Sequence, residues 1–358
     1  MILFPKQSAP HSAPPPRGGR VKEGQSEEIL QEIRSLKKKV QQLTKEIESI
    51  KTISIEDPFP VEKILQMRGI KVFRKNPTGH LFFPPDLSPF YKARFYEMMK
   101  KYSFRLVLRD MIKYQDRFRI HDLTHYCSSK VAQGYCDLLY EMGVIIKNGK
   151  GKYRTRISPL YSFGPTLEWF IAEMFKKEFA SPAIYGVSVK NTPSGGDYDV
   201  ITSWNRRLVY VEVKSSPPKG VERNEISTFF SRMDDLLPEV AILFEDTQLR
   251  MKDKLVVMFE EELGRRYGKE SKVLYSVERL FEELFHIQNH IFIVNSKKDV
   301  VENFQICLRH YLRYGTSSPS PLSLPTGPGP DRGRDRQAAL GEREKVRGCR
   351  SGDHSYEE

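Results

Sequence analysis

The sequence predicts an α/β protein, in which a C-terminal domain of alternating helices and strands follows a small basic module and a short coiled coil. Three observations support this fold class. Residues 165–296 alternate between helical and strand-like apolar patterns, residues 105–160 combine short helical segments with a basic turn, and residues 29–50 repeat apolar residues as a heptad. With 358 residues, 39% of them hydrophobic, the chain is long enough for two domains.

The first predicted element is a coiled coil over residues 25–51. Its apolar residues step by four and three, and β-branched side chains at one heptad position with mainly Leu at the other favour two strands. We therefore expect a homodimer through residues 28–51. A single amphipathic helix docked on its own domain is the alternative, because three heptads are short for a coiled coil. The heptad comprises Ile29, Ile33, Leu36, Val40, Leu43, Ile47 and Ile50.

The chain ends and the connecting region carry no predicted function. Residues 1–24 and 316–358 are rich in Pro, Ser, Gly and other polar residues, so we expect both ends to be disordered. Within the connecting region 52–104, the runs Ile70–Phe73 and His80–Phe83 flank an Asn-Pro-Thr-Gly turn and predict a hairpin.

Residues 105–160 predict three helices and a hairpin. The first helix begins at Arg105, the second covers Ile120–Tyr126, and the third follows Ser128, a favoured N-cap, and runs to about Met142. A glycine-containing turn between two short apolar runs then completes the hairpin.

This order resembles a winged helix-turn-helix, in which the third helix enters the major groove and the hairpin, or wing, contacts phosphates. Val131 and Tyr135 are predicted to face the core of the module, which leaves Lys130 and Gln133 outward, towards DNA. The alternative is that such a unit mediates protein contacts with its charges merely solvated. The predicted phosphate contacts of the wing are Lys147, Lys150, Lys152, Arg154 and Arg156.

The formal net charge of +12 is concentrated in this part of the chain. Residues 86–160 carry 15 Lys and Arg against 7 Asp and Glu, an excess of +8. A concentrated basic segment favours a nucleic acid as the partner, with double-stranded DNA as the first expectation and RNA as an open alternative.

The C-terminal domain is predicted to run in the order helix, three strands, helix, strand, helix, strand, helix. We expect helices over Thr166–Phe179, Glu222–Leu236 and Leu249–Leu263, strands over Ile184–Val189, Tyr198–Trp204, Leu208–Lys214, Val240–Phe244 and His290–Val294, and a last helix to about Tyr314.

One predicted strand carries charges on a face that otherwise reads as buried. Residues 208–214 alternate by two, so Glu212 and Lys214 share a face with Tyr210. Charged side chains in such a position are costly unless they are paired or bind a metal. Asp199, on the preceding strand, is the natural third member, and two carboxylates with a lysine suit Mg²⁺ or Mn²⁺. A solvated pair on an exposed sheet face is the alternative.

Here the sequence resembles the PD-(D/E)xK phosphodiesterase superfamily, whose members are also called restriction-endonuclease-like. The run Gly195-Gly196-Asp197-Tyr198-Asp199-Val200 matches the glycine-led first half of the motif, and Glu212-Val213-Lys214 matches the second half. Glu168 matches a helix glutamate that Holliday-junction resolvases and type IV restriction enzymes add as a metal contact. One departure is Tyr198, which stands where the motif has proline, and Asp197 competes with Asp199 for the ligand role.

The resemblance implies a mixed sheet flanked by helices over residues 161–315, after the winged-helix domain. It implies that Asp199, Glu212 and Glu168 bind Mg²⁺ or Mn²⁺, and that Lys214 orients the attacking water or stabilises developing charge. The expected function is a metal-dependent deoxyribonuclease that hydrolyses phosphodiester bonds in restriction, defence or repair. The alternative is a catalytically silent DNA-binding regulator or structural factor on the same fold.

Other classes of protein are disfavoured by what the sequence lacks. No apolar run approaches the length of a membrane span, and Pro5 ends the apolar start of the chain, so we expect a cytoplasmic protein with no membrane partner. The four cysteines are not spaced as a zinc site or a disulfide framework, and we expect reduced thiols.

Overall fold

The computed structural model describes residues 23–52, 60–149, 151–268 and 270–316, which belong to two units, Met1–Pro58 and Phe59–Glu358. The predictions of disorder for the two chain ends concern residues that, apart from Glu23, Gly24 and Thr316, lie outside the described ranges.

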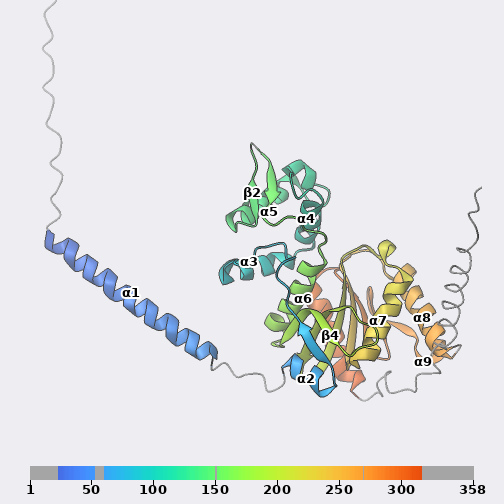
Figure 1. The fold of residues 1–358 in the computed structure, drawn as a ribbon. Coiled ribbons are helices and arrows are strands. Elements are labelled where there is room, and N and C mark those ends of the chain that lie inside the picture. Colours follow the sequence, from blue (N-terminus) through green and yellow to red (C-terminus); the bar gives the residue numbers. More distant parts are fainter. Residues whose placement is uncertain (1–22, 53–59, 150, 269, 317–358) are drawn as a thin grey trace, which may run out of the picture. The chain divides into compact units, whose positions relative to one another are not determined.

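In the first unit the described element is one long helix, α1 (Glu23–Thr52), drawn in blue in Figure 1. It is rich in Glu, Lys, Gln and Leu, which are good helix formers. Five heptad residues have described side chains, and each is more than half exposed, so the described residues of this unit leave this part of the apolar stripe uncovered. Ile47 and Ile50 lie outside the described side chains, and the coiled coil stays a prediction. The five are Ile29, Ile33, Leu36, Val40 and Leu43.

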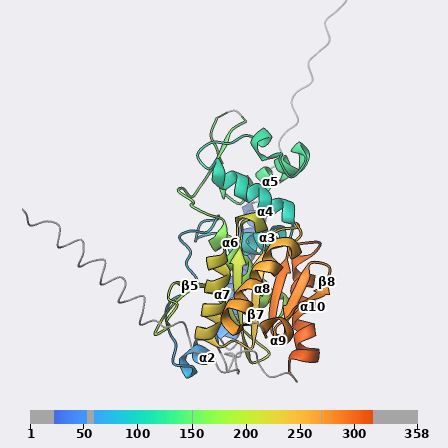
Figure 2. The same ribbon diagram turned by 90° about the vertical axis from the view of Figure 1, so that its right-hand side faces the viewer.

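The second unit is built on an eight-stranded mixed sheet with the order β1-β4-β5-β6-β7-β10-β9-β8 (Figures 1 and 2). Strands β4, β5 and β6 form an antiparallel meander, β6, β7 and β10 are parallel neighbours, and β9 and β8 extend the sheet antiparallel. The predicted α/β class is therefore confirmed. The strands are β1 (Lys71–Arg74), β4 (Ala183–Lys190), β5 (Asp197–Trp204), β6 (Arg207–Lys214), β7 (Val240–Glu245), β8 (Val277–Phe281), β9 (Leu284–Ile287) and β10 (Ile291–Asn295).

Helices cover both faces of this sheet, and each face has its own apolar core. One core packs against α2 (Val61–Met67), α7 (Arg223–Leu236) and α8 (Val257–Tyr267), and the other against α6 (Gly164–Glu178) and α10 (Val300–His310). We call them the α7 core and the α6 core. Among the described residues, no helix combines the length and apolar content needed to span a membrane. Short elements complete the unit: Pro218–Gly220, a π turn at Lys252–Val256, α9 (Ser271–Leu274) and a π turn at Tyr311–Gly315.

The basic module precedes α6 in the chain. The hydroxyl oxygen of Ser128 accepts a hydrogen bond from the Val131 amide and so caps the third predicted helix, as the sequence indicated. The three predicted helices and the hairpin are all present, with the first helix starting earlier, at Tyr102. The elements are α3 (Pro89–Met99), α4 (Tyr102–Lys113), a 3-10 turn at Ile120–Leu123, α5 (Ser129–Glu141), β2 (Ile145–Lys147) and β3 (Tyr153–Thr155).

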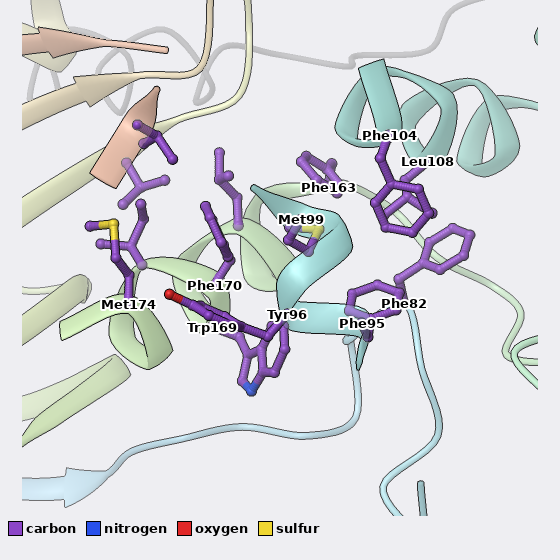
Figure 3. Packing of buried hydrophobic residues seen from close by; sticks show 14 of the residues in the cluster. Phe82, Phe95, Tyr96, Met99, Phe104, Leu108, Phe163, Trp169, Phe170 and Met174 are labelled. Carbon is purple, nitrogen blue, oxygen red and sulfur yellow. The ribbon is translucent and has the colours of Figure 1, made fainter. Parts of the chain in front are cut away.

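The apolar interior of the basic module is continuous with the α6 core. The ring of Phe95 on α3 lies 5.6 Å from the ring of Phe104 on α4 and 5.8 Å from that of Trp169 on α6, measured between centroids. Figure 3 shows these side chains from three helices meeting in one cluster. The module thus packs directly on the sheet domain.

A buried ion cluster strengthens the same junction. Arg105 on α4 is fully buried and donates from its Nε to both carboxylate oxygens of Asp246, at 2.9 and 3.1 Å, just after β7. Arg109 also pairs with Asp246, and the Ser296 hydroxyl donates to it. Burial works to raise the pKa of Asp246, but Arg105 and Arg109 outweigh it and hold that pKa below its usual value.

The predicted hairpin of the connecting region is wrong. β1 pairs with β4, and the next residues continue along β4, where the Asn76 amide donates to the Tyr185 carbonyl at 2.7 Å. Leu81, Phe82 and Phe83 are instead three consecutive buried residues. The prediction failed because the strand partner of β1 lies more than 100 residues away in the sequence, and local sequence patterns do not indicate such a distant partner.

Two further details differ from the sequence analysis. The hairpin β8–β9 was not predicted, because Leu280, Phe281, Leu284 and Phe285 recur at spacings that fit a helix as well as strands. On α5, Val131 was expected in the core but is 39% exposed, because the buried face of the helix is turned to include Ala132 and Cys136.

Candidate functional site

Strand β6 carries two of the predicted site residues on the face that α7 covers. Its residues alternate between the cores, with Tyr210 in the α7 core and Val211 and Val213 in the α6 core. Glu212 and Lys214, two and four residues further along the strand, lie on the same face of the sheet as Tyr210. Glu212 is only 2% exposed, so its carboxylate requires partners.

Beside Glu212, the side chains of β4 and β5 change which face of the sheet they lie on; we call this the exchange of faces. Tyr185 pairs with Val200 and both belong to the α6 core, whereas Val187 pairs with Tyr198 and both belong to the α7 core. Residues two apart in a regular strand share a face, so both strands are irregular between these pairs. The residues at the exchange, one on each strand, are Gly186 and Asp199.

Gly186 has the conformation and the space that only glycine satisfies here. Its φ is +53°, and a Cβ added to it would lie 2.7 Å from the ring of Pro77 and 3.6 Å from Oε2 of Glu168. The close approach of Pro77 shows that the segment after β1 borders the site. The irregularity in the sheet is therefore a built feature that brings α6, β4 and β5 together.

The carboxylate of Asp199 is tied to β6. The regular pairing of β5 with β6 ends at Val200 and Val211, and one residue further on Oδ2 of Asp199 accepts a hydrogen bond from the Val213 amide at 2.7 Å. Burial raises the pKa of Asp199 well above its usual value, and the charges of Glu212 and Glu168 raise it further.

Glu168 reaches the same place from α6, on the other side of the sheet. Burial raises its pKa to about 7, with Glu212 and Asp197 as additional causes. Within the part of the chain that the structure describes, its carboxylate makes no hydrogen bond or ion pair. Glu168, Asp199 and Glu212 thus come from three different elements and lie near enough for their charges to act on one another.

Both oxygens of Glu212 are held by cations. The Lys214 Nζ lies 3.1 Å from Oε1, and it also lies 2.8 Å from an oxygen of Glu225 on α7. The Arg232 Nη1 donates to Oε2 at 2.7 Å, and the Tyr210 hydroxyl donates to the same oxygen. Burial works to lower the pKa of Lys214, but Glu212, Glu225 and Asp199 together outweigh it and raise that pKa above its usual value.

Arg232 and Glu225 are members of this site that the sequence analysis missed. Both lie on α7, and the Arg232 side chain is only 14% exposed. Its Nη1 is also 3.9 Å from Oδ1 of Asp199, and its guanidinium lies over the Tyr198 ring at 5.6 Å. On a helix rich in charges, the sequence offers no signal that selects this arginine, because the rotation of the helix on the sheet decides which charge points inward.

Asp197, the competitor for the ligand role, is engaged elsewhere. It lies exposed at the start of β5, where its carboxylate pairs with Arg74 of β1 at 2.5 Å and accepts from the Ser188 hydroxyl. It still contributes to the raised pKa of Glu168.

The chemistry of the donor set fits a hard divalent cation. Glu168, Asp199 and Glu212 offer only oxygen, and each of the first two has a pKa raised in part by other carboxylates, a repulsion that a cation relieves. Among the described residues, no three acidic, His or Cys side chains stand at metal-binding spacing. A physical reason for this spacing is that Arg232 and Lys214 already hold both oxygens of Glu212.

The predicted DNA contacts of the basic module are mostly on its surface. Lys130, Lys147 and Arg154 are exposed, and Lys147 lies over the Tyr140 ring at 4.4 Å. Arg156 is 3.8 Å from the Asp86 carboxylate, and Lys152 is half-buried. Lys150 lies outside the described residues.

Gln133 differs from the outward position that its helix spacing suggested. It is half-buried on α5, and its amide donates to Asp137 at 2.8 Å and to the Tyr153 hydroxyl of the hairpin at 3.5 Å. It therefore ties the third helix to the hairpin.

Comparisons with known proteins add two solved structures. The chain is similar to protein VC1899 from Vibrio cholerae, with a TM-score of 0.38 and 15% identity over 59% of this chain and 57% of that one. It is also similar to Can2 from Sulfobacillus thermosulfidooxidans, solved in complex with cyclic tetra-adenylate, with a TM-score of 0.40 and 12% identity over 74% of this chain and 62% of that one. The chain thus spans about three fifths of the length of each. No protein family model and no curated protein matches the chain.

Proposed function

We propose that this protein is a metal-dependent endonuclease that hydrolyses phosphodiester bonds in DNA. The observation that carries the proposal is the convergence of Glu168, Asp199 and Glu212 with Lys214 where β4 and β5 exchange faces. Partly buried carboxylates need positive charge beside them, and whereas Arg232 and Lys214 supply it to Glu212, Glu168 has no ion pair among the described residues.

The residues of the candidate site would have two different roles in hydrolysis. Glu168, Asp199 and Glu212 would hold Mg²⁺ or Mn²⁺, which, when bound, supplies positive charge to the phosphate and acidifies water. Lys214, held by Glu225, places an ammonium group beside Glu212, where it can orient the attacking water or stabilise negative charge.

DNA would be engaged by the basic module, used as a winged helix. Support comes from the charge excess of residues 86–160 and from the exposed cations of α5 and the hairpin. The apolar packing of α3 and α4 on α6 gives the module a fixed position relative to Glu168, so bound DNA would be presented to the site in one orientation.

A catalytically silent DNA-binding factor is the second candidate. One observation favours it, namely that Arg232 and Lys214 already neutralise Glu212 without a metal. The endonuclease should cleave DNA when a divalent metal is present, whereas the silent factor should bind DNA without cleaving it.

The test is incubation of the purified protein with plasmid and short duplexes in Mg²⁺, Mn²⁺ or EDTA. Asp199→Asn, Glu212→Gln and Lys214→Ala should each lower the cleavage rate about 100-fold or more, because each removes a group that acts on the phosphate or the water. Duplex binding should stay within a few-fold, since the module is untouched. Glu260→Gln, an exposed position on α8, is the matched control and should cleave normally.

Cleavage that persists in EDTA, or that survives in all three site variants, would refute the endonuclease proposal. Duplex binding without any metal-dependent cleavage by the unaltered protein would support the silent factor instead.

A further inference from the structure

One atom stands between the two central carboxylates of the candidate site. Nη1 of Arg232 lies 2.7 Å from Oε2 of Glu212 and 3.9 Å from Oδ1 of Asp199. Among the described residues, Arg232 is the only cation within 4.0 Å of both carboxylates, because Lys214 pairs with Glu212 and Glu225 but not with Asp199. The guanidinium thus lies where a cation shared by the two carboxylates would have to be.

The surroundings of Arg232 hold the guanidinium there without satisfying it fully. It lies over the Tyr198 ring, and an added Cβ on Gly196 would come within 3.4 Å of its Nη2, so the start of β5 confines it. Its Nε is buried without a hydrogen-bond partner among the described residues. A buried donor left unpaired is costly, so the position is maintained by the carboxylates rather than by a full set of hydrogen bonds.

We propose that Arg232 is an internal competitor of the divalent cation, and that metal binds only as the Arg232–Glu212 pair opens. This inference rests on the proposed function and adds a regulation of that same site. Lys214 can stay in place during the exchange because Glu225 also holds it, whereas Arg232 has no second carboxylate at hydrogen-bond distance among the residues that the structure describes. Linkage then requires that whatever weakens the Arg232 pair strengthens metal binding.

Metal binding in the absence of DNA tests the inference. Mn²⁺ affinity, measured by electron paramagnetic resonance of the free ion, is compared for the full-length protein and for Arg232→Met, which keeps length and packing against Tyr198 but removes the charge. We expect Arg232→Met to bind Mn²⁺ about tenfold more tightly. Arg232→Lys, which keeps a cation, should stay close to the unaltered protein. Arg223→Met, an exposed arginine on the same helix, is the control and should change nothing.

The thermal midpoint of unfolding is a second readout, which keeps the test decisive if Arg232→Met is less stable than the unaltered protein. If Arg232→Met is less stable, Mn²⁺ should raise its thermal midpoint by more than it raises that of the unaltered protein, because the metal replaces the lost cation. Adding Glu212→Gln to Arg232→Met should remove the tight binding.

The outcomes separate the two proposals. Equal or weaker Mn²⁺ binding by Arg232→Met, with binding that still depends on Glu212, would overturn the role of Arg232 and leave the endonuclease proposal standing. If neither protein binds Mn²⁺, the metal site and the competitor role both fall. Tighter binding by Arg232→Met with no cleavage by either protein would support the competitor role and count against the nuclease.

Discussion

Glu245 is a buried carboxyl group at the end of β7 whose surroundings offer it no hydrogen bond. It pairs with Lys214 in the parallel ladder of β6 and β7, it is 0% exposed, and neither of its carboxylate oxygens has a partner among the described residues. Burial raises its pKa to about 9, Asp246 adds to the rise, and Arg109 and Lys214 oppose it. At neutral pH the folded protein therefore keeps this group protonated, beside the lysine of the site.

This raised pKa predicts a pH-dependent gain from Glu245→Gln. Between about pH 4.5 and 9 the unfolded chain releases the proton while the folded protein retains it, so the unaltered protein loses stability as pH rises. Glutamine cannot ionise, and its advantage should grow by up to about 1.4 kcal/mol per pH unit over this window. Urea unfolding at pH 5, 6, 7 and 8 measures it. A difference that stays constant with pH for Glu245→Gln would contradict the assignment.

The hairpin β2–β3 presents charged side chains to solvent. Ile145, Tyr153 and Thr155 are buried against the module, whereas Arg154 lies on the outer side, so alternation gives the hairpin an apolar face and a basic face. Arg156 has a long contact with Asp86, and Lys147 lies over Tyr140. These are weak constraints, and they leave the cations able to turn towards phosphates.

The salt dependence of DNA binding tests this element. If all five cations contact phosphates, log affinity should fall with log salt at a slope of about −4 to −5 from the wing alone, because each contact releases counterions. Replacing all five by Ala should flatten the slope by that amount and weaken binding to every sequence alike. The variant changes Lys147, Lys150, Lys152, Arg154 and Arg156 together.

The third helix supplies the contrasting control. Lys130→Ala should alter the preference among sequences more than the salt slope, because it lies on the helix expected in the groove. Unchanged affinity and slope in the five-fold variant would show that the wing is a solvated hairpin and would move the binding role to the sheet domain.

On the scale of the whole molecule, the described parts differ in how they bury apolar surface. The second unit has two complete cores, and the cluster of Arg105 with Asp246 lies at the junction of module and sheet. In α1, by contrast, the heptad residues with described side chains are all more than half exposed. An apolar stripe repeated in register is the pattern that a second copy of the same helix covers.

We therefore expect the full-length protein to be a dimer that depends on α1. Replacing Leu36 and Leu43 by Lys puts like charges into the stripe and should halve the mass measured by sedimentation or light scattering. Lys38→Asp, on the outward side of the helix, is the control and should leave the mass unchanged. A monomeric unaltered protein, or a dimer that survives the double change, would contradict the coiled coil.

The sequence by itself determined the elements that rest on local patterns. The alternation of residues 208–214 placed Glu212 and Lys214 on one face, Ser128 marked the start of α5, and the succession of elements along the chain from α6 to β7 followed from apolar runs and turns. These features depend on neighbours within a few residues, so periodicity and capping suffice to predict them. The same alternation selected Glu212 and Lys214, with Asp199 on the preceding strand as the third member, and the resemblance to the PD-(D/E)xK superfamily added Glu168.

Only the tertiary structure decided which side chains surround those four residues. Arg232 and Glu225 reach the site because of how α7 is turned on the sheet, and β1 joins β4 across more than 100 residues of chain. The exchange of faces at Gly186 and Asp199 arises from two strands acting together, with Pro77 pressed against them. Such contacts join residues that are distant in sequence, and the free energy that fixes them comes from packing rather than from the local preference of any one segment.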